Sequence, residues 1–562
     1  MSSRNDDLEF PGDEFGGRAS GRLLEAPGGA STFAPPDPQG SGGGGGASDV
    51  SRRVTLATVA AVSGIALGVI ALVATKNGES SPAWVVLLIA AIAGLTLLAR
   101  NLAAGIVLFL GVCWIVVRTP DVATGGSGGG QGLPLSQLGL AALLVVWIAK
   151  RFAAQNFGLY KMPLLVPAAL YLFVCFWSTI NSLVFRDPQV MAHSFVQYTQ
   201  VNILEMALRV LALGAAVMIA NELNGRALRA AAVVLLVPGL ATFSGLVPFL
   251  PSSTYLTFAQ VISASVLTAF VLTRQGALWI RVAGAAFALS ILGALLLNGT
   301  EWVSGWFSCM VALTVVTFFA NRRLLVVACV LVTLLVLVRF DYFYQAVYVT
   351  NFYKGKLTNN RTDMIRAGVL YATKFPLGIG LGNYRQYNQW YGSKEVWNTT
   401  SFSSAHGTIG QALSETGFLG LFALLLLLAS IVRMLYHAWR VLPPGRAKSY
   451  VLGALGAFVG VASAAAFNGD YIFPTYHNGA MATFGATVYL FFLIGVAGAI
   501  AREHGVVFSA AAAAPAPLPV SPPAVPVAPR ERPAAPRRPA PLINRPLGNP
   551  SAPRAATGET RS

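Results

Sequence analysis

Charged residues are scarce in this chain. Only 11% of its 562 residues are Asp, Glu, Lys or Arg, whereas a soluble domain carries about 25%. Hydrophobic residues make up 55%, and apolar runs with short connections fill most of the chain from Val54 to Ala501. A soluble globular protein is therefore excluded. The composition predicts an all-α polytopic membrane protein, because each span must satisfy its backbone amides within its own helix.

Cysteine is rare as well, and no metal-binding pattern is present in the sequence. The four cysteines all fall inside apolar runs, where they behave as small hydrophobic residues: Cys113, Cys175, Cys309 and Cys329. Their spacing fits neither a metal site nor a disulfide framework. Residues 341–408, the long polar stretch between two apolar runs, hold no cluster of carboxylates or histidines and no Asp-x-Asp pattern, so we expect no metal and no cofactor.

Acidic residues are outnumbered by basic ones, 22 to 39, which gives a formal net charge of +17. The basic residues are spread over connections and are not gathered in one patch, so a nucleic-acid partner is not expected. The excess is typical of the positive-inside bias of proteins embedded in membrane lipids, together with a basic tail.

Apolar runs predict about fourteen transmembrane helices, with twelve as the lower bound. The expected spans are 54–75, 82–99, 102–118, 133–149, 163–184, 201–220, 230–248, 255–273, 278–297, 302–320, 324–340, 409–432, 448–467 and 479–500.

Basic residues alternate between the connections and thereby predict sidedness. Arg52 and Arg53 precede the first span, which indicates a cytoplasmic N-terminus. Alternation then assigns the other basic connections to the same side, with both termini in the cytoplasm. Residues 341–408 become one large extracytoplasmic loop between spans 11 and 12.

These predictions divide the chain into five parts. Residues 1–50 are expected to be a disordered cytoplasmic tail, because they lack periodic apolar residues. The Pro/Ala/Arg-rich residues 506–562 are expected to be a second one, because their proline content favours extended polyproline II without a packed core. Residues 51–340 hold spans 1–11, residues 341–408 form the loop, and residues 409–505 hold spans 12–14.

The loop 341–408 is net cationic, although the positive-inside bias predicts the opposite for an extracytoplasmic segment. An anionic substrate explains this charge, because arginine binds phosphate oxygens bidentately. Arg361 opens an expected amphipathic helix, whose free amides and partial positive charge add to anion affinity. Arg366 and Arg385 are further candidate ligands, although Arg366 could instead pair with Asp363.

The sequence FPLGIGLGNY follows this expected helix and contains Gly378, Gly380 and Gly382. A dinucleotide-binding loop would need a preceding strand, and none is expected here. A tight turn with close backbone approach is the better interpretation.

His406 is the only histidine of the large loop and stands just before the span 409–432, in SSAHGTIGQALSETG. A neutral imidazole can take a proton from a hydroxyl group, which makes His406 the candidate catalytic base. The alternative is a helix-entry residue at the interface. Glu415 lies nine residues on, about 180° around a continuous helix, so we do not expect it to orient His406.

Two charged residues, Glu205 and Arg209, lie inside the expected span 201–220. Their i, i+4 spacing places them on one helix face. They form either a mutually neutralising structural pair, or Arg209 lines an outward-facing cavity and binds the anionic substrate.

The arginine-led helix, the glycine-rich turn and His406 occur together, and in this combination the chain resembles the O-antigen ligase and polymerase superfamily of bacterial membrane glycosyltransferases. The resemblance covers about residues 280–430. The family's Arg-led helix, glycine-rich turn, and His before a Glu-x-Gly-x-x-Gly helix correspond here to Arg361–Arg366, PLGIGLGNY, His406, and ETGFLG at 415–420.

The resemblance implies metal-independent, inverting glycan transfer on the outer face of the bacterial inner membrane. The donor would be a glycan on undecaprenyl diphosphate, the acceptor a glycan or lipid, and the product a surface polysaccharide made with other assembly proteins. Arg361 would then bind the diphosphate and His406 would activate the acceptor hydroxyl. Ligase and polymerase activities both remain open.

The chain departs from the family pattern in two places. Gly407 follows the histidine, where the family commonly has Asn, and Thr300-Glu301-Trp302 stands where many members carry Ser-Arg-Gly. Arg209 or Arg186 could replace the missing arginine. A lipid-linked oligosaccharide flippase and an inactive assembly scaffold are the alternative functions. Transporters usually show repeated halves, and no internal repeat is found here.

Overall fold

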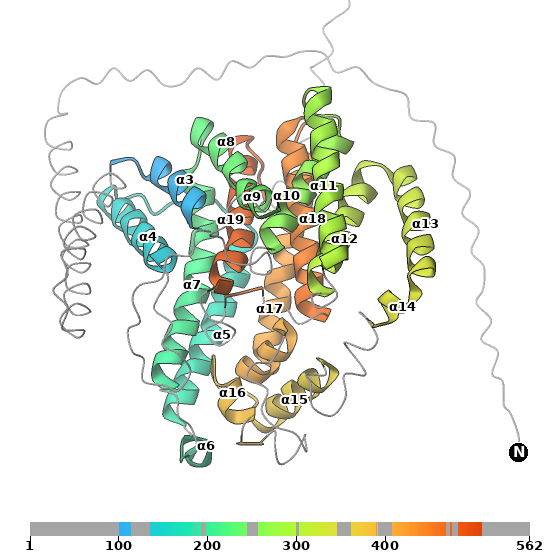
Figure 1. The fold of residues 1–562 in the computed structure, drawn as a ribbon. Coiled ribbons are helices and arrows are strands. Elements are labelled where there is room, and N and C mark those ends of the chain that lie inside the picture. The colour runs from blue at the N-terminus through green and yellow to red at the C-terminus, as the bar shows by residue number, and fades with distance from the viewer. Residues whose placement is uncertain are drawn as a thin grey trace, which may run out of the picture.

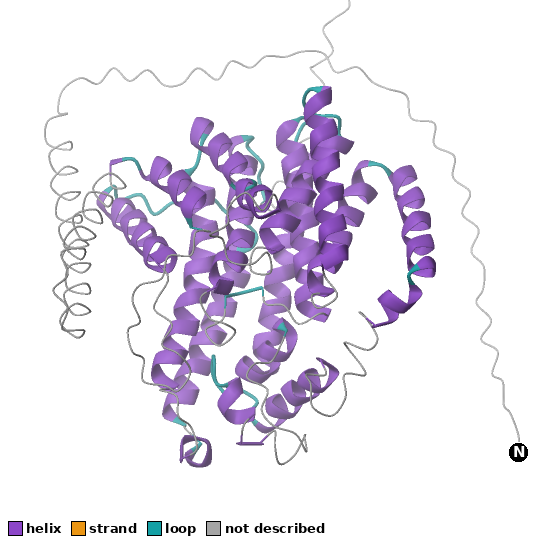
Figure 2. Ribbon diagram, in the orientation of Figure 1, coloured by secondary structure: helices purple, strands orange, loops and turns teal. Residues whose placement is uncertain are grey.

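A computed structural model of the protein consists of helices joined by loops (Figure 2), and no strand occurs among the residues that it describes. The structure describes residues 100–113, 135–185, 187–192, 198–243, 257–298, 303–345, 361–388, 390–391, 407–467, 472–474 and 482–508.

The described helices follow one another along the chain in two groups, before and after residue 275. The first group is α3 (Leu102–Val112), α4 (Leu135–Ala153), α5 (Leu165–Val184), α6 (Pro188–Ala192), α7 (Tyr198–Glu222), α8 (Gly225–Val234), α9 (Val237–Phe243) and α10 (Thr257–Leu272). The second is α11 (Leu278–Asn298), α12 (Val303–Ala320), α13 (Arg322–Val338), α14 (Phe340–Phe343), α15 (Arg361–Lys374), α16 (Tyr384–Tyr387), α17 (Thr408–Val441), α18 (Arg446–Phe467) and α19 (Ala482–Glu503).

The described residues include five helical segments that are long and apolar enough to cross a membrane: Ser136–Ala153, Leu165–Val184, Val201–Glu222, Thr408–Val441 and Arg446–Ala466. Shorter apolar helices accompany them in α3, α10, α11 and α12. The expectation of an all-helical membrane protein is confirmed. The expected spans 54–75 and 82–99, residues 1–50 and most of 506–562 lie outside the described residues.

The single span expected at 230–248 is wrong in its described part, which forms two helices. α8 ends at Val234 and α9 begins at Val237. Pro238 explains the break, because proline has no N–H to donate to the carbonyl of Val234 and its ring clashes with that carbonyl in a continuous helix. The apolar run continues through the turn, so hydropathy alone does not reveal it.

Close helix contacts hold the centre of the bundle, where α18 packs between α10 and α12 (Figure 1). Gly453, Gly456 and Gly460 lie along the contact surface of α18. A Cβ atom at Gly453 would lie 2.4 Å from Val266 Cα, and one at Gly460 would lie 2.3 Å from the Ser308 carbonyl oxygen. Small residues therefore let these backbones meet, as is common between helices in membranes.

The two long helices α7 and α17 run from this central bundle to the lower end of the molecule as drawn in Figure 1, where α6, α15 and α16 lie. The name lower lobe is used below for residues 187–192, 361–388 and 390–391. Helix α15 begins at Arg361, which confirms the helix expected there. The lobe thus contains most of the described part of the long polar connection 341–408.

Candidate functional site

A tight turn at residues 376–383 joins α15 to α16. Its three glycines all have left-handed backbone angles, with φ of 82° at Gly378, 90° at Gly380 and 74° at Gly382. The Gly378 amide donates to the carbonyl of Phe375 at 2.7 Å, which closes the first bend. Residues with a Cβ rarely adopt such angles, so the alternating glycines permit this path. The expected close-approach turn is confirmed.

The turn packs on a break in α17. Gly417 interrupts that helix with φ 69° and ψ −169°. Carbonyl groups just before such a break lose their usual helical donors and need other partners. The Ile379 amide donates to the carbonyl of Ser414 at 3.0 Å, and the Gly380 amide to that of Glu415 at 3.1 Å. These two hydrogen bonds fix the glycine turn to α17 directly before its break.

Two of the glycines have no room for a side chain at this contact. A Cβ atom at Gly378 would lie 2.2 Å from the Glu415 carbonyl oxygen, and one at Gly417 would lie 2.1 Å from the Pro376 carbonyl oxygen. Both distances are far below van der Waals contact, and both involve backbone atoms. Glycine is therefore required on each side of the interface.

The opposite side of the turn is bound to α7. The side-chain amide of Asn202 donates to Asn383 Oδ1 at 2.9 Å and also to the carbonyl of Leu381. The Asn383 side chain in turn donates to the carbonyl of Ile379 at 2.8 Å, inside the turn itself. Helix α5 joins the same unit, because Ser178 Oγ donates to the Glu415 carbonyl at 2.5 Å.

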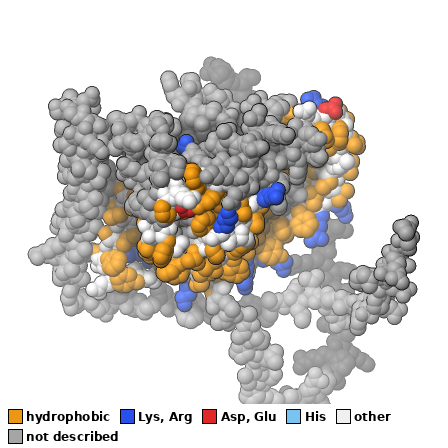
Figure 3. Space-filling model, turned by 90° about the horizontal axis from the view of Figure 1, so that it is seen from below, with side chains coloured by type: hydrophobic (Ala, Val, Ile, Leu, Met, Phe, Trp, Pro, Cys, Tyr) orange, Lys and Arg blue, Asp and Glu red, His pale blue; other side chains and the backbone are white. Residues whose placement is uncertain are grey.

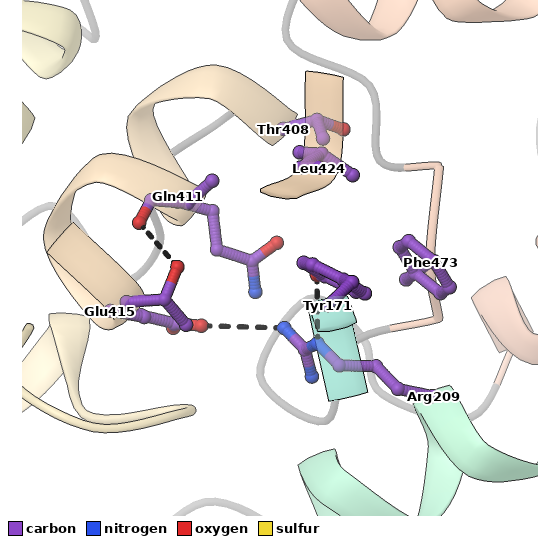
Figure 4. Close-up of a pocket in the computed structure, with 9 residues that line it drawn as sticks. Tyr171, Arg209, Thr408, Gln411, Glu415, Leu424 and Phe473 are labelled. Atoms are coloured by element: carbon purple, nitrogen blue, oxygen red, sulfur yellow. Dashed lines mark hydrogen bonds and ion pairs between the residues drawn. The ribbon is translucent and has the colours of Figure 1, made fainter. Parts of the chain in front are cut away.

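A buried cluster of charges adjoins the glycine turn, at Gly382. Arg209 Nη1 is 2.7 Å from Glu205 Oε2, and Arg209 Nη2 is 3.4 Å from Glu415 Oε2. Arg209 Nε donates to the Tyr171 hydroxyl oxygen at 3.4 Å. In Figure 4 the guanidinium group lies between the Glu415 side chain and the Tyr171 ring. The expected pairing of Glu205 with Arg209 is present, and Glu415 joins it from α17.

This cluster borders a small pocket at the start of α17 (Figure 4). The lining residues come from α5, α7, α17 and the segment 472–474: Tyr171, Arg209, Thr408, Gln411, Ala412, Glu415, Thr416, Leu424 and Phe473. Gly407, with φ 142°, caps α17 immediately before Thr408. The candidate base His406 directly precedes this cap and lies outside the described residues.

The candidate arginines occupy different environments. Arg209 is buried, whereas Arg366 on α15 and Arg385 on α16 are exposed on the lower lobe and do not line the pocket. Arg361 is the first residue of α15, and its side chain lies outside the described residues. The described surface seen from below carries Lys and Arg side chains at several places (Figure 3).

Glu415 and Tyr171 belong to the site although neither was a candidate. Glu415 stands at the start of ETGFLG, so the family resemblance contained the signal. The expectation about Glu415 considered only its position relative to His406 on one helix. Its observed partner is 206 residues away in the sequence, on α7. Tyr171 lies inside an apolar run and carries no recognisable sequence signal.

The fold and the site define a polytopic helical membrane protein with one polar unit, formed by α15, the glycine turn and the first turns of α17. Residues 285–425 match the family described as O-Antigen ligase, and this range includes the whole of that unit. The resemblance to the O-antigen ligase superfamily is thus confirmed for this part of the chain. No curated protein matches the sequence.

The buried charge cluster supports a prediction about stability. Arg209→Leu leaves two buried carboxylates without their cation, so we expect a loss of about 3–5 kcal/mol in the free energy of unfolding. Unfolding of the purified protein in detergent measures this loss. Arg440→Leu is the matched control, because Arg440 is exposed and bonds the hydroxyl of Tyr436. Equal stability of the two variants would contradict the prediction.

Proposed function

We propose that this protein is a membrane glycosyltransferase of the O-antigen ligase or polymerase type. It transfers glycan from a polyprenyl-diphosphate donor to a glycan or lipid acceptor on the outer face of a bacterial inner membrane. The family match over 285–425 supports this proposal. One structural observation supports it most strongly. The glycine turn binds α15 to the start of α17, which joins the segment opened by Arg361 to the segment that follows His406.

The proposed donor site is the start of α15. Arg361 occupies the first position of this helix, where free backbone amides and the helix dipole favour an anion. Arg366 and Arg385 add exposed positive charge on the same lobe. A site outside the cytoplasm has no access to nucleotide sugars, so a donor already activated by a lipid diphosphate fits this location.

The proposed chemistry is a single displacement with inversion. His406 takes the proton of the acceptor hydroxyl as its oxygen bonds to the anomeric carbon of the donor glycan. The bond between that carbon and the diphosphate oxygen breaks, and the polyprenyl diphosphate leaves with the electron pair. Arginine side chains stabilise the negative charge of the leaving group, the role that a metal ion has in metal-dependent transferases.

Reconstitution tests the proposal against the alternative functions. The purified protein in liposomes, supplied with a polyprenyl-diphosphate oligosaccharide and an acceptor, should release polyprenyl diphosphate and form a new glycosidic bond. Movement of the lipid-linked oligosaccharide between leaflets without a new bond would favour a flippase. Longer glycan still on its carrier would identify a polymerase, and glycan moved to a lipid acceptor a ligase.

Arg361→Ala should lower the specificity constant for the lipid-linked donor by about tenfold to a hundredfold. A hydrogen bond between charged groups contributes about 1.5–3 kcal/mol, which corresponds to this range. Initial rates of transfer at varied donor concentration measure the effect. Arg322→Ala is the control, because Arg322 is exposed at the start of α13. Equal donor dependence in both variants would remove Arg361 from the donor site.

A further inference from the structure

An aromatic cluster lies on the lower lobe, outside the pocket described above. The ring centroids of Phe375 and Tyr387 are 5.3 Å apart, and those of Phe375 and Tyr391 are 6.2 Å apart. The rings of Tyr387 and Tyr391 are 6.1 Å apart and nearly parallel, at 24°. Trp390 is the neighbour of Tyr391. Phe375, Trp390 and Tyr391 are half-buried, so part of each side chain remains accessible.

Polar contacts hold these rings in place. The Tyr391 hydroxyl donates to the carboxylate of Asp187, and Trp390 Nε1 donates to Gln189 Oε1 at 3.0 Å. Asp187 also accepts from the backbone amide of Gln189 at 2.9 Å, so both partners belong to one bonded segment at the start of α6. Lys374 Nζ lies 5.4 Å from the Tyr391 ring centroid. The cluster is therefore preorganised, which lowers the entropy lost when a ligand binds.

Gln386 is the second and independent feature of the lobe. It lies in α16 between Tyr384 and Tyr387 and is 3% exposed. Within the described structure, neither its amide nitrogen nor its amide oxygen has a hydrogen-bond partner. A buried amide without partners destabilises a protein, and each such group requires an explanation. A ligand that offers both a donor and an acceptor would satisfy the amide nitrogen and the amide oxygen of Gln386.

We propose that the aromatic cluster and Gln386 form a carbohydrate-binding subsite for the acceptor glycan, and that binding turns the buried Gln386 amide toward the ligand. The C–H faces of sugar rings pack on aromatic rings, and sugar hydroxyls both donate and accept hydrogen bonds. The exposed Lys374 adds positive charge suited to acidic substituents on the glycan. The identity of the ligand as the acceptor rests on the proposed transferase function.

The position of the lobe connects this subsite to the proposed reaction. α16 follows the glycine turn directly and packs on α17. The rings of Tyr371 in α15 and Tyr384 in α16 are in edge-to-face contact, with centroids 5.9 Å apart. A glycan held on the lobe therefore lies on the structural unit that connects α15 with the start of α17.

Direct binding tests the subsite without any turnover. The probe is a set of oligosaccharides released by mild acid from the surface polysaccharide of the producing cells, so it carries no lipid and no diphosphate. The full chain in lipid nanodiscs is titrated with these oligosaccharides by calorimetry. Gln386→Leu should weaken binding about tenfold, because the leucine cannot bond a hydroxyl. Its melting temperature should stay equal to that of the unchanged protein or rise, because the buried unpaired amide is removed.

Trp390→Ala should also weaken binding about tenfold, and Trp279→Ala is its matched control. Trp279 lies on α11 and is 72% exposed, so its removal should leave oligosaccharide affinity unchanged. Unchanged affinity in Gln386→Leu and Trp390→Ala would overturn the subsite. A lower melting temperature of Gln386→Leu would overturn it as well, since the amide would then be structural. An effect of Trp390→Ala on lipid association alone would instead identify an interfacial anchor.

The same measurements separate the two proposals. Oligosaccharide binding that depends on Gln386 and Trp390, without transfer by the unchanged protein, would refute the transferase and leave the subsite standing. Transfer with unchanged acceptor dependence in both variants would refute the subsite and leave the transferase standing. With both proposals correct, the two variants raise the KM for acceptor and leave kcat nearly unchanged.

Discussion

Replacing His406 by alanine is expected to lower the rate of glycan transfer by about 100- to 10,000-fold, the range that general acid–base catalysis contributes. The acceptor hydroxyl would then have to attack without a group to receive its proton. Binding of the lipid-linked donor should change little, because the proposed diphosphate ligands are arginines. Single-turnover rates in liposomes, at saturating donor and acceptor, measure the chemical step directly.

A control histidine and a chemical rescue make this test specific. His437→Ala changes an exposed histidine of α17, twenty-nine residues after the start of that helix, and should leave the rate unchanged. Added imidazole should restore part of the activity of His406→Ala, because it can accept the proton in place of the side chain. Full turnover by His406→Ala would rule out the proposed base. A loss that imidazole does not restore, with a reduced melting temperature, would indicate a structural role.

Replacing Gly378 by alanine is expected to release the glycine turn from α17 and to abolish transfer. The new Cβ atom would lie 2.2 Å from the Glu415 carbonyl oxygen, a backbone atom that cannot move without moving the helix. The φ of 82° adds strain of about 1–2 kcal/mol for a residue with a Cβ. The amide hydrogen bonds of Ile379 and Gly380 would be lost with the contact, so we expect a total destabilisation of about 2–4 kcal/mol.

Gly505→Ala separates the clash from the backbone strain. Gly505 has a similar φ of 68°, but a Cβ atom there would meet nothing within 4 Å. This variant should show only the backbone strain and keep its transfer activity. Limited proteolysis of the lower lobe and thermal unfolding in detergent compare the two variants. Equal destabilisation and equal activity would mean that the contact between the turn and α17 is not essential.

Most described helices agree with the expected spans, because a run of about twenty apolar residues is a strong local signal. The span expected at 163–184 is α5 at Leu165–Val184, and the one expected at 448–467 is α18 at Arg446–Phe467. The prediction of a single span at 230–248 was wrong, because the hydropathy of this run is continuous although Pro238 interrupts the helix. Hydropathy reports the environment of a segment and is less sensitive to its hydrogen bonding.

Part of the candidate site could also be predicted locally. The start of the helix at Arg361 and the tight turn at Gly378, Gly380 and Gly382 were both expected, because their signals lie within a few adjacent residues. The pairing of Glu205 with Arg209 was one of two open alternatives, and i, i+4 spacing made it testable. The roles of Arg361, Arg366, Arg385, Arg209 and His406 in the reaction remain predictions.

The amino-acid sequence by itself determined the helical membrane class, the resemblance to the O-antigen ligase superfamily, and the local form of the glycine turn. Only the tertiary structure decided which carboxylates neutralise Arg209 and what the glycine turn packs against. Glu415 reaches Arg209 across 206 residues of intervening chain. Such a contact depends on how three helices pack around the break at Gly417, and no local periodicity or spacing encodes that arrangement.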